Sequence, residues 1–297
     1  MEKEIKENAE LMNTDSSNYV VMANELIKGK SALTLNATKI LRTAIMQIKP
    51  DDEEIKPFVI AVEDFAELIG KETTDYLYND LKRVAKELLS SVIEIEDRTA
   101  KKNKWKGLNW CSECLCENGM FYIYLNNRLK PYLIGLQKLY TQYQLDFILQ
   151  FRSIYGIRLY ELIKMGLQNI KIIKPHQQVD VEIMLDVIRR ATDTEKTYPN
   201  ISDFKKRVIV PAINDINKIP LGLIVSYDDI KKGRKVIGFT FHVTSWTAQN
   251  PLPPEKHKQI DDFKERMKEK ERRKREQIKG QYDIEDYEQF YKLRGED

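Results

Sequence analysis

Cysteine, histidine and long apolar runs are scarce in this chain, and each shortage excludes a class of protein. Three cysteines among 297 residues are too few for the disulfide framework of a small secreted domain. No stretch comes near the roughly 18 uncharged apolar residues that a membrane-spanning helix requires. The polar N-terminal sequence, MEKEIKENAELMNTD, lacks the apolar segment of a signal peptide. We therefore expect an intracellular protein of the bacterial cytoplasm.

The residues that catalysis requires are also missing. The three histidines lie far apart and include no His-x-His pair, which a DNA-nicking replication enzyme needs to hold a metal beside its tyrosine. No Gly-x-Ser-x-Gly or Gly-x-Gly-x-x-Gly motif occurs. Cys111, Cys114 and Cys116 have zinc-like spacing, but no fourth ligand lies nearby. We predict no catalytic residue, no cofactor and no metal site, and we interpret the cysteines as small structural side chains whose further role stays open.

The charges nearly cancel, with 49 Lys and Arg against 46 Asp and Glu, and this balance excludes both a histone-like polycation and an acidic solvating chain. Hydrophobic residues make up 42% of the chain, which is enough to bury a substantial core. A net charge of +3 leaves nucleic-acid binding open, because the placement of the charges decides it.

The spacing of apolar residues predicts an α+β, helix-rich fold made of two tandem winged-helix domains. In each half, an amphipathic helix, a strand, a helix-turn-helix and a β-hairpin follow one another. The expected parts are a flexible arm (residues 1–17), a first winged-helix domain (18–130) with hairpin strands near 92–95 and 120–125, a connecting helix (131–151), a second winged-helix domain (152–250) and a charged C-terminal tail (251–297).

Basic residues gather where a winged helix meets DNA. The start of the last helix of the second domain carries Lys205-Lys206-Arg207, and its hairpin turn carries Lys231-Lys232 and Arg234-Lys235. The first hairpin carries Lys101, Lys102 and Lys104. A helix-turn-helix presents the first part of its second helix to the major groove while the wing reaches the flanking backbone. Positive charge at both places therefore predicts contact with DNA phosphates.

Three motifs resemble the initiator Rep proteins of iteron-containing plasmids over about residues 18–245. They are Ser153-x-Tyr155-x-x-Arg158-Leu159-Tyr160-Glu161-Leu162, then Phe204-Lys-Lys-Arg207-Val208-Ile-x-Pro211-Ala212, and the opening Tyr19-x-x-Met22-Ala23-Asn24-Glu25-Leu26. The resemblance implies a protein that binds repeated origin DNA as a monomer and recruits host replication proteins and helicase. It also implies a homodimer that represses the initiator's own gene.

By the same resemblance, the helix at 202–217 is the main major-groove reader, and Arg207 suits bidentate reading of guanine. The full set of expected DNA contacts is Ser202, Lys205, Lys206, Arg207, Lys231, Lys232, Arg234, Lys235, Tyr78, Asn79, Lys82, Arg83, Lys86, Lys101, Lys102 and Lys104. A stand-alone winged-helix transcriptional repressor remains the alternative, since it would have the same fold and the same basic surfaces.

Overall fold

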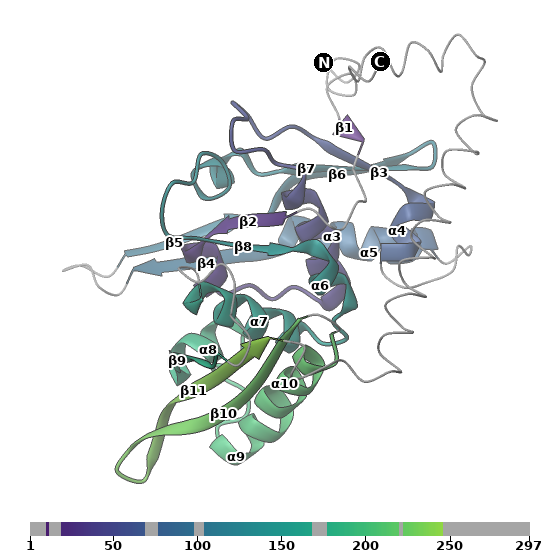
Figure 1. Cartoon of the computed structure of the whole chain (residues 1–297). Coiled ribbons are helices and arrows are strands. Elements are labelled where there is room, and N and C mark those ends of the chain that lie inside the picture. Colours follow the sequence, from purple (N-terminus) through teal and green to yellow (C-terminus); the bar gives the residue numbers. More distant parts are fainter. Residues whose placement is uncertain are drawn as a thin grey trace. The chain divides into compact units, whose positions relative to one another are not determined.

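Helices and β-hairpins follow one another along the chain in two groups (Figure 1). The computed structural model describes residues 10–11, 19–68, 77–97, 104–167, 177–219 and 222–245. The expected arm over residues 1–17 is described only at Glu10–Leu11, the two-residue strand β1, which pairs in parallel with Phe58 and Val59. The expected charged tail over residues 251–297 lies outside the described residues.

The first group of elements contains the winged-helix order together with additional strands. A helix (α3), a strand (β3), a helix pair (α4 and α5) and a hairpin (β4 and β5) follow one another. In chain order the elements are β2 (Tyr19–Ala23), α2 (Asn24–Lys28), α3 (Leu35–Met46), β3 (Phe58–Ala61), α4 (Val62–Leu68), α5 (Leu77–Ser90), β4 (Val92–Asp97), β5 (Lys104–Asn109), β6 (Cys111–Glu117), β7 (Met120–Leu125), the 3-10 helix η1 (Asn127–Tyr132), β8 (Tyr140–Gln144) and α6 (Leu145–Gln150).

The second group repeats the winged-helix order without additions. Its elements are α7 (Ile154–Gly166), β9 (Val179–Met184), α8 (Leu185–Ala191), α9 (Ile201–Phe204), the π-helical turn η2 (Lys205–Ile209), α10 (Val210–Asn217), β10 (Leu223–Lys232) and β11 (Lys235–Ser245). The hairpin β10–β11 is joined by β9 in a three-stranded antiparallel sheet of order β10-β11-β9. The predicted fold class, α+β with two tandem winged-helix units, is confirmed.

The leading helix of each unit begins at a hydroxyl side chain. At the start of α3, Thr34 Oγ1 accepts the amide of Ala37 at 3.4 Å. At the start of α7, Ser153 Oγ accepts the amide of Tyr155 at 3.1 Å. A side-chain oxygen in this position satisfies an amide that has no partner inside the helix, so both starting points follow from the local sequence.

The single connecting helix expected over residues 131–151 is absent. In its place η1 ends near Pro131, an irregular segment follows, and then come β8 and the short helix α6. Gly135 and Leu139 both have positive φ values, which interrupt a helix. Residues of β8 alternate between buried and more exposed and pair antiparallel with β2, so this segment belongs with the first unit.

The expected first hairpin is also rearranged. We predicted that strand 92–95 would form a hairpin with 120–125, but β4 pairs with β5, while β7 pairs with β3 and β6 in a sheet of order β1-β3-β7-β6. Strands β5 and β6 were missed because lysines and cysteines, rather than β-branched residues, dominate them. The cysteine cluster therefore lies on β6 and not in the wing.

A buried carboxylate on α7 connects the two units. Glu161 accepts hydrogen bonds from Arg42 Nε of α3 at 2.7 Å, from Arg158 Nη1 at 2.5 Å and from the hydroxyl of Tyr143 on β8 at 2.6 Å. Glu161 has no exposed surface, and both arginines are almost fully buried. Three donors on one carboxylate therefore fix α3, α7 and β8 against one another.

The guanidinium of Arg158 extends this network to the ends of two more helices. It donates to the carbonyls of Ile27 and Gly29 at the end of α2, each at 2.8 Å, and to the carbonyl of Ala191 at the end of α8 at 2.9 Å. Carbonyls in the last turn of a helix lack partners within it, so Arg158 satisfies groups in both units at once.

The charges of this network stabilise one another. Burial alone would raise the pKa of Glu161, but Arg42 and Arg158 together outweigh burial and hold the pKa of Glu161 below its ordinary value. Glu161 is therefore ionised at neutral pH, in contact with both guanidinium groups.

The core of the second unit lies between its last helical segment and its sheet. Phe204, Val208 and Ile209 of the helical segment are buried, and so are Phe239 and Phe241 of β11. Because the apolar residues on one side of this segment are buried, the residues on its opposite side face outward.

Replacing Glu161 with Gln should destabilise the protein by about 3–5 kcal/mol, because two buried guanidinium groups lose their shared counter-charge. Urea denaturation followed by circular dichroism measures this change. Exposed Glu182 is the matched control, and Glu182→Gln should leave the unfolding midpoint nearly unchanged. Equal midpoints for the two variants would contradict the role assigned to Glu161.

Replacing Phe204 with Asp should unfold the second unit, because a charge would enter a fully buried site. We expect a loss of at least about 4 kcal/mol, since loss of a buried phenyl ring alone costs about 3–5 kcal/mol. Val210, 41% exposed in the same helical segment, provides the control. Thermal melts should show a much larger decrease for Phe204→Asp than for Val210→Asp, and similar melts would place Phe204 outside the core.

Candidate nucleic-acid interface

The candidate reading helix consists of α9, η2 and α10, which form one uninterrupted helical segment from Ile201 to Asn217. Its N-cap is Asn200, whose Oδ1 accepts the amide of Ser202 at 2.9 Å. Ser202, at which the sequence predicted the helix to begin, lies inside the first turn and is exposed. Asn200 lies two residues earlier, and asparagine is as good an N-cap as serine.

The basic triplet of this helix lies in a π-helical turn. Residues Lys205–Ile209 adopt it directly before Pro211, and the amide of Val210 donates to the carbonyl of Lys205, five residues back. Proline has no amide hydrogen and its ring collides with the carbonyl four residues before it, here that of Arg207. A wider turn relieves this conflict, and such turns often occur at functional sites.

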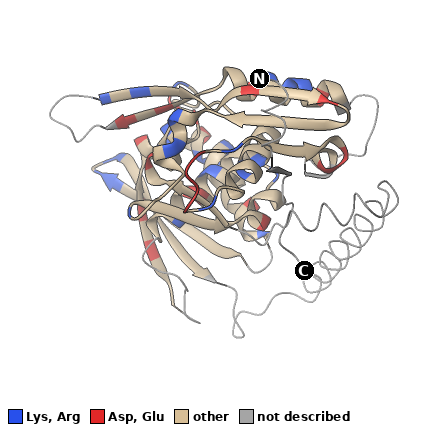
Figure 2. Ribbon diagram, turned by 90° about the horizontal axis from the view of Figure 1, so that it is seen from above, with Lys and Arg blue, Asp and Glu red and all other residues tan. Residues whose placement is uncertain are grey.

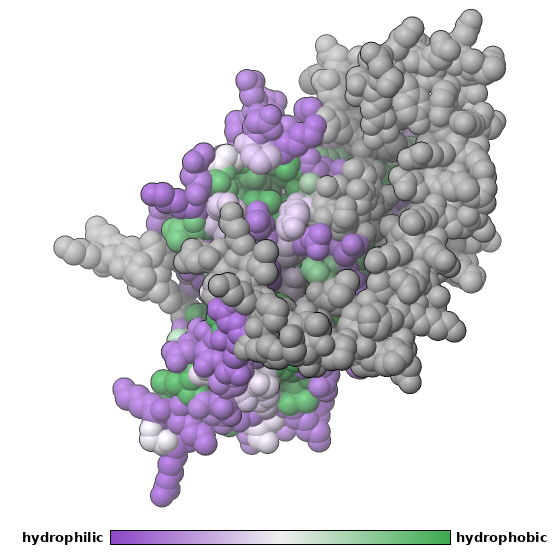
Figure 3. All heavy atoms as spheres, viewed as in Figure 1, coloured by the Kyte–Doolittle hydropathy of each residue, from purple (hydrophilic) through white to green (hydrophobic). Residues whose placement is uncertain are grey.

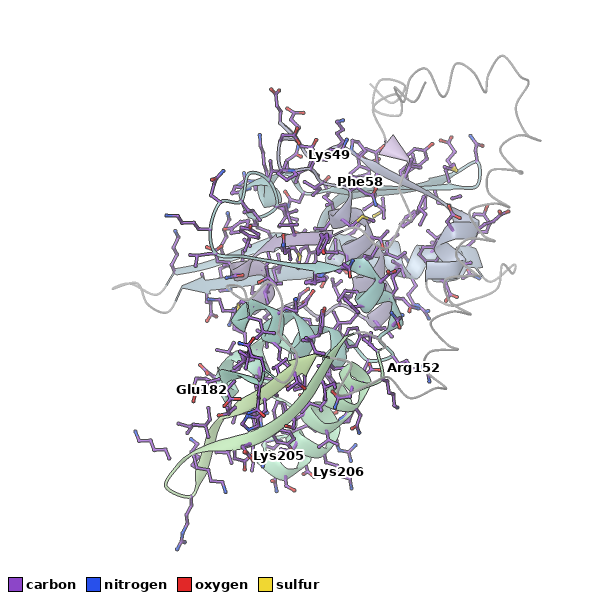
Figure 4. The ribbon with its side chains drawn as sticks, in the orientation of Figure 1. Lys49, Phe58, Arg152, Glu182, Lys205 and Lys206 are labelled. Atoms are coloured by element: carbon purple, nitrogen blue, oxygen red, sulfur yellow. The ribbon has the colours of Figure 1, made fainter. Side chains whose placement is uncertain are left out.

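The three basic residues of the triplet differ in their surroundings. Lys206 and Arg207 are exposed, and the Arg207 guanidinium lies 5.8 Å from the centre of the Tyr198 ring. Lys205 is held instead by Asp229 of β10, with its Nζ 2.6 Å from the carboxylate. Figure 4 shows Lys205 beside the wing strands and Lys206 farther from them. The structure therefore leaves two of the three side chains open for DNA.

The second wing ends in a basic turn. Lys231, Lys232, Arg234 and Lys235 are all exposed there. Gly233 has a φ of 62°, a conformation that glycine adopts without strain, and it allows β10 to return directly as β11. Figure 3 shows that the projecting tip of this hairpin is hydrophilic. The wing thus extends four positive side chains beyond the body of the unit, as predicted.

Helix α5 of the first unit carries the other predicted contact surface. Tyr78, Asn79, Lys82, Arg83 and Lys86 are all exposed on it. The Arg83 guanidinium pairs with Asp80 at 2.7 Å, but its side chain remains 69% exposed. An exposed pair of this kind contributes little to stability, so Arg83 can exchange its partner for a phosphate at low cost.

The structure describes the first wing only in part. Lys104 is exposed at the start of β5, whereas Lys101 and Lys102 lie outside the described residues. In the β4–β5 ladder, Lys104 is paired with Asp97 and Lys106 with Ile95. Figure 2 shows basic residues on one strand of this hairpin and acidic residues on the other. Lys106 Nζ is 5.0 Å from the centre of the Tyr132 ring. Of the three residues predicted to contact DNA from the first wing, Lys104 is the one within the described part of the chain, and its contact with DNA stays a prediction.

The cysteines show no sign of a metal centre within the described part of the chain. Cys111 is buried, Cys114 half-buried and Cys116 exposed along β6. No group of three or more metal-ligating side chains comes together among the described residues. Across the same residues, no helix combines the length and the apolar character that crossing a bilayer requires.

Sequence reasoning missed a charged cluster on the outer face of the second sheet. His242 of β11 lies between two carboxylates, with Nδ1 2.8 Å from Asp180 of β9 and Nε2 3.1 Å from Asp228 of β10. Hydrogen bonds to Asp180 and Asp228 raise the pKa of His242. A strand register is needed to see this cluster, because the three residues are far apart in the sequence.

Two winged-helix units, each with an exposed polar or basic helix and a hairpin beside it, define a tandem winged-helix protein with the surfaces of a DNA-binding protein. Family models extend this assignment. Residues 19–164 match the model described as "Initiator Replication protein, WH1", and residues 184–243 match "Initiator Rep protein, WH2". The chain belongs to the initiator Rep protein family, as its motifs predicted.

Individual relatives agree with this assignment. The chain is 23% identical over 229 residues to a replication initiation protein of Escherichia coli, which covers 75% of this chain and 69% of that protein. It is 24% identical over 247 residues to an uncharacterised 27.6 kDa protein of the same species, over 78% of this chain and 96% of that protein. The crystal structure of the Pi initiator protein with iteron DNA shares the fold, with a TM-score of 0.61, 21% identity and coverage of 78% of this chain and 99% of that one.

The His242 cluster predicts that stability depends on pH. Because the pKa of folded His242 is raised, its contribution is fully present below the unfolded pKa of about 6.5 and is lost as pH rises through the folded value. The unfolding free energy of the wild type should therefore fall relative to that of His242→Gln as pH increases from about 6 to 8. NMR titration of His242 checks the raised pKa directly, and an ordinary value would contradict the cluster.

Proposed function

We propose that this protein initiates plasmid replication by binding directly repeated (iteron) origin DNA with both winged-helix units. The observation that carries the proposal is that the second unit has two exposed basic surfaces. One is formed by Lys206 and Arg207 on the reading helix, and the other by the four basic residues of the wing tip. The family assignment supports it, and the structural neighbour of the same fold is an initiator bound to iteron DNA.

In the second unit, the reading helix enters the major groove and the wing contacts the flanking backbone. Arg207 is the candidate for a bidentate contact with guanine, since its planar guanidinium matches the two acceptors of that base. Lys206 and the wing residues Lys231, Lys232, Arg234 and Lys235 neutralise phosphates, which makes binding strong and dependent on salt.

In the first unit, α5 follows the DNA backbone through the exposed residues Tyr78, Asn79, Lys82, Arg83 and Lys86, with Lys104 at the wing. One unit supplies base reading and the other mainly supplies phosphate contacts. Phosphate contacts fix the position of a protein on the duplex but carry no sequence information themselves.

The remaining steps of initiation follow from DNA binding without a catalytic group. Bound initiator in the bacterial cytoplasm recruits the host replication proteins and helicase, and a homodimer in equilibrium with the monomer represses the initiator's own gene. A plasmid that carries only this gene and its upstream repeats should replicate, whereas a repressor alone would not support replication.

Binding to repeats is the direct test. Fluorescence anisotropy with a duplex from the repeats near the gene should give an affinity at least about 1000-fold tighter than that for a scrambled duplex. Footprinting should then protect each repeat. Equal affinity for the two duplexes would overturn the proposal.

Replacing the two open residues of the reading helix should separate their roles. Arg207→Ala should weaken binding to repeats by about 1–3 kcal/mol and reduce the preference over scrambled DNA. Lys206→Ala should weaken binding to both duplexes and reduce the salt slope by about 1.

Lys49→Ala provides a control with the same charge change, because Lys49 is exposed in the first unit and lies away from the reading helix (Figure 4). Its binding should stay close to that of the wild type. A loss for Lys49→Ala as large as the loss for Arg207→Ala would show that net charge alone decides the affinity.

A further inference from the structure

Among the residues that the structure describes, Lys205 is the one member of the basic triplet that has an acidic partner. Its Nζ lies 2.6 Å from each carboxylate oxygen of Asp229. The side chains of Lys205 and Asp229 are 25% and 18% exposed, so the pair is partly shielded from solvent. A shielded pair is screened less by salt than the exposed charges beside it.

The position of Asp229 explains how it reaches the helix. Along β10, Val225 and Tyr227 face inward, and Tyr227 packs against Phe239 of β11. Because side chains alternate along a strand, Asp229 points to the same side two residues closer to the wing tip. Phe239 also supports the pair, since Lys205 Nζ lies 5.8 Å from the centre of its ring.

A carboxylate at this place is unfavourable for binding phosphates. It lies between the basic helix start and the basic wing tip, and Lys231 Nζ comes within 4.0 Å of it. A protein that needed only tight binding would gain from a neutral residue here. We therefore looked to sequence discrimination, rather than to overall affinity, for the role of Asp229.

We propose that Asp229 is a specificity-determining positioning residue that prevents Lys205 from contacting the phosphates of non-matching DNA. The inference rests on the proposed DNA-binding function. A free lysine gains affinity for any duplex, because every sequence offers phosphates. Occupying Lys205 lowers that general affinity, and specificity rises because it is the difference between the two affinities.

The same ion pair fixes the wing to the reading helix. Lys205 lies on the helix and Asp229 on the wing strand, so their contact holds the distance between the two DNA-contacting elements. Arg207, two residues further along the same helix, reads the bases. Base reading requires that the distance between the helix and the wing stay constant while the wing is bound to the DNA backbone.

The test compares Asp229→Asn with Asp203→Asn. Asp203 is exposed on the first turn of the same helical segment and forms no ion pair among the described residues, so it gives the same charge change without releasing a lysine. For Asp229→Asn, affinity for a scrambled duplex should rise on the order of five- to tenfold at ~0.1 M salt, and the salt slope should steepen by about 0.9. The ratio of repeat to scrambled affinity should fall.

A double variant separates the released lysine from the lost carboxylate. Lys205→Gln combined with Asp229→Asn should return scrambled-duplex affinity to the wild-type value, since the gain requires the freed ammonium. Equal gains for Asp229→Asn and Asp203→Asn, or a gain that persists in the double variant, would overturn the inference. A decrease in both affinities by the same factor would show a structural role only.

A measurement without DNA keeps this inference separate from the proposed function. Acylation of the free protein with an amine-reactive ester, read by mass spectrometry, should modify Lys205 severalfold more slowly than Lys206. In Asp229→Asn the two rates should become similar. Similar rates in the wild type would refute the ion pair itself, whereas absent repeat preference with protected Lys205 would refute only the proposed function.

Discussion

The carboxylate of Glu161 is the group on which the arrangement of the two winged-helix units depends. It lies in a site without solvent, where an ion is unfavourable unless it is paired, and it is paired with two guanidinium groups from α3 and α7. Arg158 also donates hydrogen bonds to carbonyls at the ends of α2 and α8. Apolar contacts would hold these helices together equally well, but directional hydrogen bonds specify one arrangement out of many.

Other contacts between the units have the same charged character. Lys30, which follows α2, pairs with Asp193 and Glu195 after α8. Arg190 of α8 pairs with Glu96 of the first wing at 2.7 Å. Inside the second unit, the close approach of α10 to α7 requires Gly156, since a Cβ there would lie 2.8 Å from Asp215 Oδ2. The contacts between the two units are thus defined mainly by polar geometry.

The sequence predicts the second unit far better than the first. Apolar residues at helical spacing predict α7 and the reading helix, and alternation predicts β10 and β11. The reading helix and the two strands each bury one face, whereas α7 is buried on all sides over residues 156–163. Strands β5 and β6 of the first unit bury little, and β6 has no β-branched residue, because three of its seven residues are cysteines and two are glutamates. The partners of β4 and β8 are set by contacts distant in the sequence, which local patterns do not record.

The candidate interface was predicted by residue type but not by environment. Exposed Lys206, Arg207 and the wing lysines follow from periodicity, because they fall off the apolar stripe of their elements. The pairing of Lys205 with Asp229 does not follow from it, since 24 residues separate the partners. Serine is a residue type that often caps a helix, but Asn200 rather than Ser202 is the N-cap here. The choice between them depends on where the backbone becomes helical.

The two wings differ in stiffness because their strands have different neighbours. At its base, where β9 pairs with residues Gly238 to Val243 of β11, the second wing belongs to a sheet of three strands, so bending it there distorts two rows of backbone hydrogen bonds. Within the described part of the chain, strands β4 and β5 of the first wing pair with each other alone, apart from a single bridge between Glu94 and Lys30. If both wings contact one DNA site, the wing at one end of the site therefore bends more easily than the wing at the other end. Variation in groove width is then tolerated beside the compliant wing and penalised beside the rigid one.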